Sequence, residues 1–146
     1  MNYEILSAVF NSDMNKVVNL INNGCNVNIR DTYGTTSLHL AVQKKIINIV
    51  NVLVSAGANV NLPNIKGYTP LHLAVLDNDI NIVNILIQAG ANVNTWDYKG
   101  DTPLHLVSMK GYNQLVKTLI DKGSDINSQN YSGNTPLHLA ACSKQH

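Results

Sequence analysis

Several residue types are scarce in this 146-residue chain, and each scarcity excludes a class of protein. Only two cysteines are present, which excludes a small scaffold held together by several disulfides. Lysine and arginine together number 10 against 9 aspartates and glutamates, so the net charge is +1. The chain also lacks any basic run of the kind that nucleic-acid-binding proteins carry. We therefore expect no nucleic-acid partner.

Long apolar segments are missing as well. No run of 18 apolar residues occurs, so no membrane-spanning helix and no membrane partner are expected. The segment from Met1 to Met14 does not combine a basic stretch with an apolar one, as a secretory signal does. Hydrophobic residues nevertheless make up 45% of the chain, which is enough to bury the core of one domain. These features predict an intracellular, cytoplasmic protein.

What the sequence does contain is an internal repeat with a fixed period. Three sets of residues recur at every thirty-third position: Gly34, Gly67, Gly100 and Gly133; His39, His72, His105 and His138; and Gly24, Gly57, Gly90 and Gly123. Self-similarity at a fixed period of this length is typical of stacked repeat proteins. Each unit has too little apolar surface to bury alone, so its stability must come from its neighbours.

The residues around these positions predict two helices in each unit. Four threonines stand where a side-chain oxygen accepts from the first free N–H groups of a helix: Thr36, Thr69, Thr102 and Thr135. Three of them are followed by proline, which is favoured at the first helical position. The glycines at 24, 57, 90 and 123 are expected to end the second helix in a left-handed conformation. The glycines at 34, 67, 100 and 133 are expected to supply a positive φ at a hairpin tip.

The block T-P-L-H-L-A, followed later in the same unit by G-A-N-V-N, resembles the ankyrin repeat over essentially the whole chain. The resemblance implies an all-α solenoid of stacked helix-turn-helix units with short β-hairpin fingers. It also implies that the repeated histidine is a structural hydrogen-bonding residue. Because the chain contains no phosphate-binding glycine motif and no convergent Ser/His/Asp set, we expect that it is not an enzyme.

The alignment of the units divides residues 1–146 within a single domain. Residues 1–29 form an N-terminal capping repeat without a finger, and full repeats are expected at 30–62, 63–95 and 96–128. Residues 129–146 form a truncated final repeat with no second helix of its own. We expect the apolar side of that last repeat to require a covering element.

Neither the histidines nor the cysteines predict a reactive site. Successive repeat histidines lie about 8–10 Å apart in stacked helices, whereas zinc needs its ligands within about 2.1 Å of one point. Cys25 and Cys142 belong to the first and last repeats, too far apart for a disulfide. We therefore expect no metal, no cofactor, no catalytic residue and two reduced thiols.

Candidate binding residues are those that vary from one repeat to the next. In the family that the chain resembles, the fingers and the inner face of the first helix form a concave binding surface. Five of the eight aromatic residues fall on the predicted fingers, and three aliphatic or thioether side chains are expected on the same side. Tyrosine and tryptophan dominate interface hot spots because they give a large contact area at little entropic cost. The predicted partner-binding residues are Tyr33, Ile65, Tyr68, Leu76, Trp96, Tyr98, Met109 and Tyr131.

These observations favour a non-catalytic, monomeric module that binds a protein partner. The asparagine-rich composition resembles that of ankyrin proteins from poxviruses, large DNA viruses and intracellular bacteria, which commonly engage host proteins. Two alternatives remain. In one, the asparagines at 28, 61, 94 and 127 are substrates of an asparaginyl hydroxylase, although capping of the hairpin in every repeat is the stronger explanation of these residues. In the other, the chain is a structural spacer, with its aromatic residues packed flat to stiffen the fingers.

Overall fold

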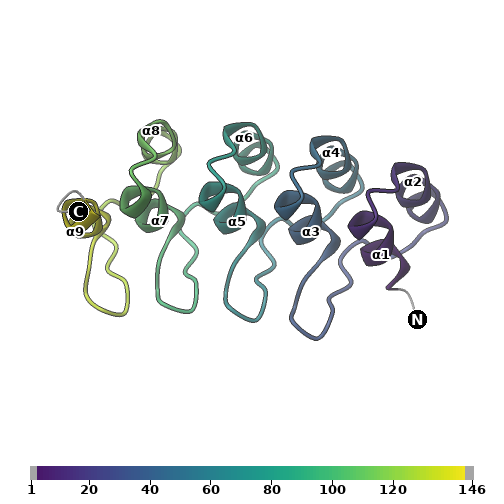
Figure 1. Ribbon diagram of the computed structural model, residues 1–146, viewed down its shortest axis with the longest axis horizontal. Coiled ribbons are helices and arrows are strands. Elements are labelled where there is room, and N and C mark those ends of the chain that lie inside the picture. Colours follow the sequence, from purple (N-terminus) through teal and green to yellow (C-terminus); the bar gives the residue numbers. More distant parts are fainter. Residues whose placement is uncertain (1–2, 144–146) are drawn as a thin grey trace.

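The computed structural model describes residues 3–143, which form nine α-helices and no β-strand. The helices lie in two rows, with the odd-numbered helices in one row and the even-numbered helices in the other (Figure 1). Between successive helix pairs, and again before the last helix, a long loop extends beyond the odd-numbered row (Figure 1). We call each of these loops a finger. The helices are α1 (Glu4–Phe10), α2 (Met14–Asn22), α3 (Ser37–Gln43), α4 (Ile47–Ser55), α5 (Pro70–Leu76), α6 (Ile80–Gln88), α7 (Pro103–Lys110), α8 (Asn113–Asp121) and α9 (Pro136–Ser143).

The first helix of each repeat begins at the predicted threonine. In α5 the Thr69 hydroxyl accepts from the N–H of His72, and Nδ1 of His72 accepts in return from the Thr69 N–H at 3.1 Å. The same reciprocal capping box begins α3 and α7, and Pro70 and Pro103 occupy the first helical position. The threonine caps and the role of the prolines are confirmed. The histidine completes the capping box as an acceptor, a detail that the spacing alone did not predict.

The turns inside each helix pair require a left-handed residue. Four residues adopt it with φ between 53° and 74°, namely Ser12, Lys45, Asn78 and Gly111. Left-handed backbone is costly for a residue with a Cβ, so the three non-glycine positions store some strain. The predicted glycines after each second helix have φ of 80° to 96°, and those of the fingers have φ of 72° to 78°. Both glycine predictions are confirmed.

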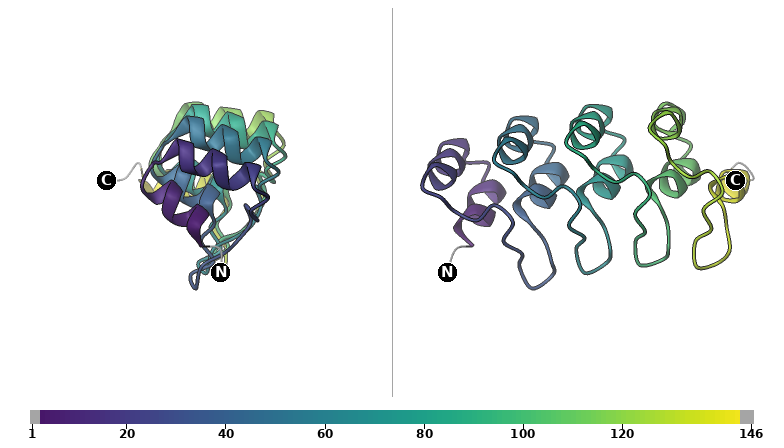
Figure 2. Two further views of the ribbon diagram at one scale, coloured as in Figure 1. Left: turned by 90° about the vertical axis from the view of Figure 1, so that its right-hand side faces the viewer. Right: turned by 180° about the vertical axis from the view of Figure 1, so that it is seen from behind.

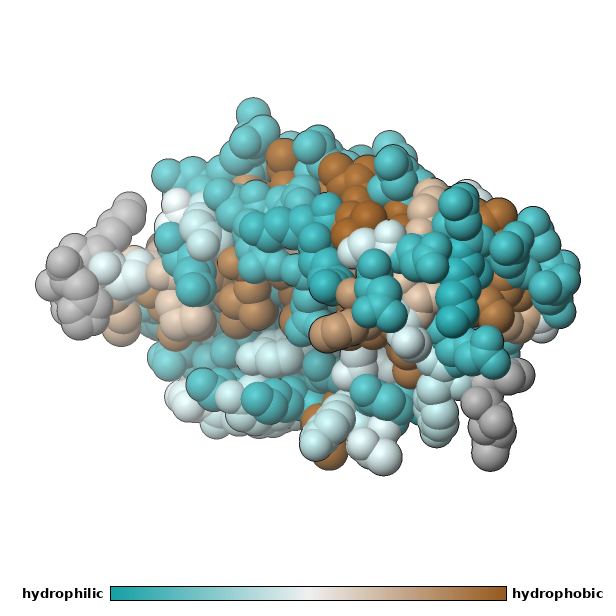
Figure 3. All heavy atoms as spheres, turned by 45° about the vertical axis from the view of Figure 1, so that its right-hand side comes forward, coloured by the Kyte–Doolittle hydropathy of each residue, from teal (hydrophilic) through white to brown (hydrophobic). Residues whose placement is uncertain are grey.

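The core runs the length of the stack between the two rows of helices. Its second-helix leucines, Leu53, Leu86 and Leu119, have no exposed surface. On the face shown in Figure 3, hydrophobic side chains appear in several patches divided by hydrophilic residues. The described helices include none that is both long and apolar enough to cross a membrane.

Both end-on and rear views show the same regular stacking, with the fingers side by side along one edge (Figure 2). First helices pack on first helices, as α1 on α3 and α3 on α5, and the first helices α1, α3, α5 and α7 each pack on the second helix of their own repeat as well. Contacts therefore connect near neighbours in sequence, as expected of a solenoid. The predicted all-α repeat fold is confirmed.

Candidate functional site

Each finger is held in shape by one side chain rather than by a strand ladder. Asp97 accepts from the N–H groups of Lys99 and Asp101 through the same carboxylate oxygen, at 2.8 and 2.9 Å. A single backbone pair, Asp97 N–H to Asp101 C=O, spans the finger, and Gly100 donates back to Asp97. The other fingers repeat this pattern around Asp31, Asn64 and Asn130. The fingers are thus hairpin-shaped turns, and the described residues contain no β-ladder because the side chain takes the N–H groups a ladder would use.

Neighbouring fingers are also bonded to one another. The N–H of Tyr98 donates to Lys66 C=O at 2.9 Å, and the N–H of Tyr131 donates to Lys99 C=O at 3.0 Å. The fingers approach so closely that a Cβ added to Gly67 would lie 2.9 Å from the Tyr98 nitrogen. This backbone contact fixes the spacing of the side chains that the fingers present.

The repeated histidines bond each first helix to the next finger. Nε2 of His39 lies 2.8 Å from Tyr68 C=O, that of His72 3.2 Å from Asp101 C=O, and that of His105 2.8 Å from Asn134 C=O. Because Nδ1 accepts from the backbone, Nε2 carries the proton and donates in each case. Burial lowers the pKa of His39 and of His72 below the usual histidine range, which keeps both rings neutral. The predicted structural role of these histidines is confirmed.

The repeated asparagines also connect repeats, and the expectation that they cap their own hairpin is wrong. Asn94 accepts from the N–H of Asp125 and donates to the carbonyl of Gly123, which lies just after α8. Asn61 makes the same two bonds to Asn92 and Gly90. An amide side chain suits this role because it offers a donor and an acceptor together.

The structure divides the predicted aromatic residues among separate places. The rings of Tyr68 and Tyr98 meet edge to face with centroids 6.1 Å apart, and Tyr68 also lies 5.9 Å from the ring of His72. Tyr68 is partly buried there, and burial followed by the nearby Asp97 carboxylate raises the pKa of its phenol. The ammonium of Lys99 lies over the Tyr98 ring at 5.5 Å.

Trp96 and Tyr131 line a different hollow. Together with Pro63, Asn61 and Asn94 they border a groove of about 410 Å³ between successive fingers. Trp96 is 59% exposed and Tyr131 is 72% exposed. Tyr98 does not line this groove, so Trp96 and Tyr98 do not share one surface pocket. The first-helix residues that were predicted to bind, Leu76 and Met109, do not line it either.

The remaining predicted residues are spread along the stack. Tyr33 and Ile65 are exposed on the first two fingers. Met109 is exposed on α7, whereas Leu76 of α5 is partly buried against the core. Ile65 donates its N–H to the Tyr33 carbonyl at 2.8 Å, so these two residues lie on adjacent bonded fingers, whereas Leu76 and Met109 lie on first helices.

Two carboxylates that the sequence analysis did not single out, Asp97 and Asp101, are buried in the finger row. Asp97 and Asp101 are both almost inaccessible to solvent, and Asp101 accepts from the Asn130 side-chain amide at 2.8 Å. The signal for Asp97 was its alignment with Asp31, Asn64 and Asn130 at the repeat interval. Asp97 accepts from backbone N–H groups of its own finger, and Asp101 accepts from the next finger. Both carboxylates therefore stabilise the finger row and are not free acidic groups.

In residues 3–143 no three histidine, cysteine, aspartate or glutamate side chains gather as metal ligands would. Cys25 is a free thiol packed partly against the core, and burial raises its pKa; Cys142 is a free, exposed thiol on α9. What the site offers chemically is therefore contact: aromatic faces, a groove lined by Trp96, Pro63 and polar side chains, and lysine ammonium groups on fingers that are bonded to one another.

Comparison with known families gives two overlapping matches. Residues 5–97 match a model described as ankyrin repeats (3 copies), and residues 86–140 match one described as ankyrin repeats (many copies). No curated protein matches the chain.

Proposed function

The chain belongs to the ankyrin-repeat family, whose members are generally protein–protein interaction modules and typically non-catalytic, and from that premise we propose that it binds a protein partner through its finger row and first helices. The observation that supports this surface is the exposure of Tyr33, Trp96, Tyr98 and Tyr131 on fingers whose backbones are bonded to each other. Fixed aromatic side chains lose little freedom when they bind.

Two parts of this surface offer different contacts. The groove beside Trp96 and Tyr131 offers an incoming side chain the Trp96 ring and Pro63 as apolar contacts, with the polar side chains of Asn61 and Asn94 also in its wall. The Tyr98 ring with the Lys99 ammonium above it offers a flat face and a positive charge next to it. A partner segment with an apolar side chain beside an acidic one complements both. The spacer alternative leaves this exposed aromatic surface without a role.

The finer features of the function are also proposals. We propose that the chain acts as a monomer in the cytoplasm and that its partner is a host protein. The asparagine-rich composition and its resemblance to viral and bacterial ankyrin proteins support that choice.

The test compares finger variants with matched outer variants. Immobilised wild-type chain, Trp96→Ala, Tyr98→Ala and the double variant Lys117→Ala/Lys122→Ala are incubated with cell lysate, and retained proteins are identified by mass spectrometry. Lys117 and Lys122 are exposed on and just after α8, away from the fingers. A partner should be retained by the wild type and the lysine variant, and it should be lost from the finger variants.

The purified partner is then titrated by calorimetry. Loss of a hot-spot aromatic residue should weaken binding by about 2 kcal/mol or more, roughly thirtyfold. Urea unfolding should change little, because the exposed rings contribute few core contacts. Retention of every partner by both finger variants would refute the proposed surface. Unfolding of Trp96→Ala with unchanged affinity per folded molecule would make the aromatic residues part of the scaffold.

A further inference from the structure

Charge is unevenly distributed over a chain whose net charge is only +1. The part of each finger from the position of Arg30 to that of Thr35, which we call its tip, comprises residues 30–35, 63–68, 96–101 or 129–134. The first three tips each carry one exposed cation, and these are Arg30, Lys66 and Lys99. The fourth tip carries no charged residue. Positive side chains therefore follow one another across three neighbouring fingers.

The carboxylates of the tips do not cancel this charge at the surface. Asp97 and Asp101 are buried and hydrogen-bonded within the finger row. Asp31 is half-buried, and one of its oxygens accepts from the N–H groups of Tyr33 and Thr35. The exposed carboxylates of the chain all lie outside the tips, and they are Glu4, Asp13, Asp77, Asp121 and Asp125. The accessible charge of the tips is therefore of one sign.

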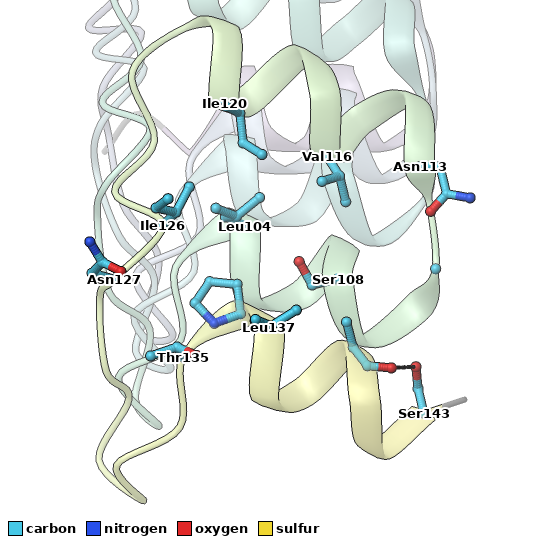
Figure 4. A pocket seen from close by; sticks show the side chains of 13 residues that line it. Leu104, Ser108, Asn113, Val116, Ile120, Ile126, Asn127, Thr135, Leu137 and Ser143 are labelled. Atoms are coloured by element: carbon cyan, nitrogen blue, oxygen red, sulfur yellow. Dashed lines mark hydrogen bonds between the residues drawn. The ribbon is translucent and has the colours of Figure 1, made fainter. Parts of the chain in front are cut away.

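Other surfaces of the stack lack this uniform sign. At the C-terminal ends of α3, α5 and α7 the corresponding residues are Lys44, Asp77 and Lys110, so the charges alternate. The hollow between α8 and α9 is lined by residues such as Ile120 and Leu137, and none of the described residues that line it is charged (Figure 4). Of these three surfaces, only the tips offer cations alone to an acidic ligand.

The backbone of the tips is not free to pair with a partner strand. In the third finger the N–H of Tyr98 donates to the Lys66 carbonyl. The N–H groups of Lys99 and Asp101 donate to the Asp97 side chain. Strand addition depends on unpaired main-chain groups at an edge. A segment that lies across the tips is therefore held by side chains, and its own conformation must not depend on hydrogen bonds to the fingers.

The spacing of the cations favours one such conformation. Lys66 and Lys99 are equivalent residues of adjacent repeats, whose packed helices lie about 8–10 Å apart. A polyproline II helix rises about 3.1 Å per residue with about three residues per turn, so its residues i and i+3 lie on one side about 9.3 Å apart. In a β-strand the residues on one side are separated by about 6.6 or 13 Å, and neither value matches.

From the charge and the spacing we infer that the finger tips bind an acidic segment of a partner protein in the polyproline II conformation, with carboxylates at positions i and i+3 that face Lys66 and Lys99. This inference rests on the proposed function and names the chemistry of the partner. The Tyr98 ring is 52% exposed and lies under the Lys99 ammonium, while its N–H meets the Lys66 carbonyl. Tyr98 therefore adjoins both lysines, and aromatic faces are the surfaces on which polyproline II segments dock.

The number of cations disfavours two other anionic partners. Nucleic-acid binding through charge draws on many phosphate contacts and a clearly basic surface. Anionic membranes attract clusters of about four to eight lysines and arginines. The tips carry three exposed cations on a chain of net charge +1. That is enough for a short acidic segment, in which the placement of the charges gives specificity.

The probe for this proposal is a fluorescein-labelled peptide of four Asp-Pro-Pro triplets, which carries a carboxylate at every third residue of a polyproline II helix. Fluorescence anisotropy with the whole chain should show saturable binding. The affinity should fall about threefold or more between about 0.05 M and about 0.5 M salt, because exposed charges are screened. A peptide of the same composition with its aspartates at every second residue should bind about threefold more weakly. Equal binding of both peptides, or no saturable binding, would overturn the proposal.

Variants of the chain locate the contact. Lys66→Gln and Lys99→Gln should each weaken binding of the peptide about twofold, and together about fivefold. The matched control Lys117→Gln/Lys122→Gln removes two exposed lysines on and just after α8, with the same change of net charge, and should leave the affinity unchanged. Leu137→Ala, in the hollow of Figure 4, should also leave it unchanged. An equal loss in the lysine control would show that total charge alone matters and would overturn the assignment to the tips.

The same assay separates the other anionic partners. A single-stranded oligonucleotide of twelve thymidines, and vesicles that contain equal parts of phosphatidylserine and phosphatidylcholine, should both bind more weakly than the acidic peptide. Tighter binding of either one would overturn the proposal in favour of nucleic acid or of a membrane surface.

The partner recovered from lysate distinguishes this inference from the proposed function. Lys66→Gln/Lys99→Gln should bind that partner more weakly than the wild type does. If the double variant keeps full affinity while Trp96→Ala loses the partner, the finger row binds a protein without an acidic segment, and only this inference fails. Retention by Trp96→Ala and Tyr98→Ala as well would refute the proposed function itself.

Discussion

The histidine that joins one repeat to the next allows a direct test of what stabilises the stack. His72 is completely buried, with its Nδ1 bonded to Thr69 and its Nε2 to the carbonyl of Asp101. His138 makes the same bond to Thr135, but it is exposed and its Nε2 has no carbonyl partner among residues 3–143. His72→Ala and His138→Ala therefore remove the same side chain with and without an inter-repeat bond.

The expected magnitudes differ by several-fold. His72→Ala leaves the Thr69 N–H and the Asp101 carbonyl without their partner, at about 1–3 kcal/mol for each buried group. A cavity adds to this cost, so we expect a loss of about 3–6 kcal/mol. His138→Ala removes only an exposed capping contact, where water replaces the lost partner, and should cost about 0.5–1 kcal/mol.

Urea unfolding followed by circular dichroism measures both values from the midpoint and the slope. An unchanged slope shows that the two states being compared are the same as in the wild type. Thr135→Ala serves as a control for loss of the terminal cap and should resemble His138→Ala. Equal losses for the two histidine variants would show that the inter-repeat bond does not stabilise the stack. A loss for His72→Ala below about 0.5 kcal/mol, the least that one net hydrogen bond contributes, would show the same.

Three further predictions concern the same scaffold. Gly67→Ala should lower the free energy of unfolding by at least about 1 kcal/mol more than Gly57→Ala. Both glycines have a positive φ, but of the two only Gly67 has backbone atoms within 2.9 Å of the position of the new Cβ. Equal urea midpoints of the two variants would contradict this prediction. Burial lowers the pKa of His39 and of His72, so these residues take up protons in the unfolded chain first as the pH falls below about 6.5. The free energy of unfolding should therefore decline there by up to about 1.4 kcal/mol per pH unit for each residue. A urea midpoint that is constant from pH 7.5 to 5.5 would refute this prediction. Amide hydrogen exchange, followed by mass spectrometry, should be faster in α9 than in α6, which has a second helix on either side, and equal protection would contradict that reasoning.

The repeat positions of the sequence were sufficient to predict most of the fold. Thr69, Pro70 and Gly90 each have a local stereochemical preference that does not depend on distant contacts, so their roles as cap, first helical residue and helix end were readable. The absence of strands in the described fingers was not readable. It follows from Asp97 and its equivalents taking two N–H groups each, which only the folded loop shows.

The candidate surface was less predictable than the scaffold. The number of aromatic residues on the fingers suggested one patch, but Trp96 stands at the position of Arg30 and Pro63, whereas Tyr98 stands at that of Ile65 and Tyr131. Different positions on a finger face different neighbours, so Tyr98 pairs with Tyr68 while Trp96 lines the groove. The role of Asn94 was hidden for another reason: its partners are backbone groups of the following repeat, and backbone groups leave no mark in a sequence.

The bonds between repeats have a consequence for how such a chain can change in length. His39 and Asn61 each reach into the following repeat, and in each case the group they meet is a backbone carbonyl or N–H that every residue type other than proline supplies. Removing residues 63–95 as one block would place the same backbone groups of the following unit before the same side chains. A deletion or duplication of one whole unit therefore leaves these side chains matched to backbone groups of the following unit, whereas one that falls short of a whole unit shifts them all. We therefore expect a chain that has lost or gained one whole unit to keep these bonds between its repeats.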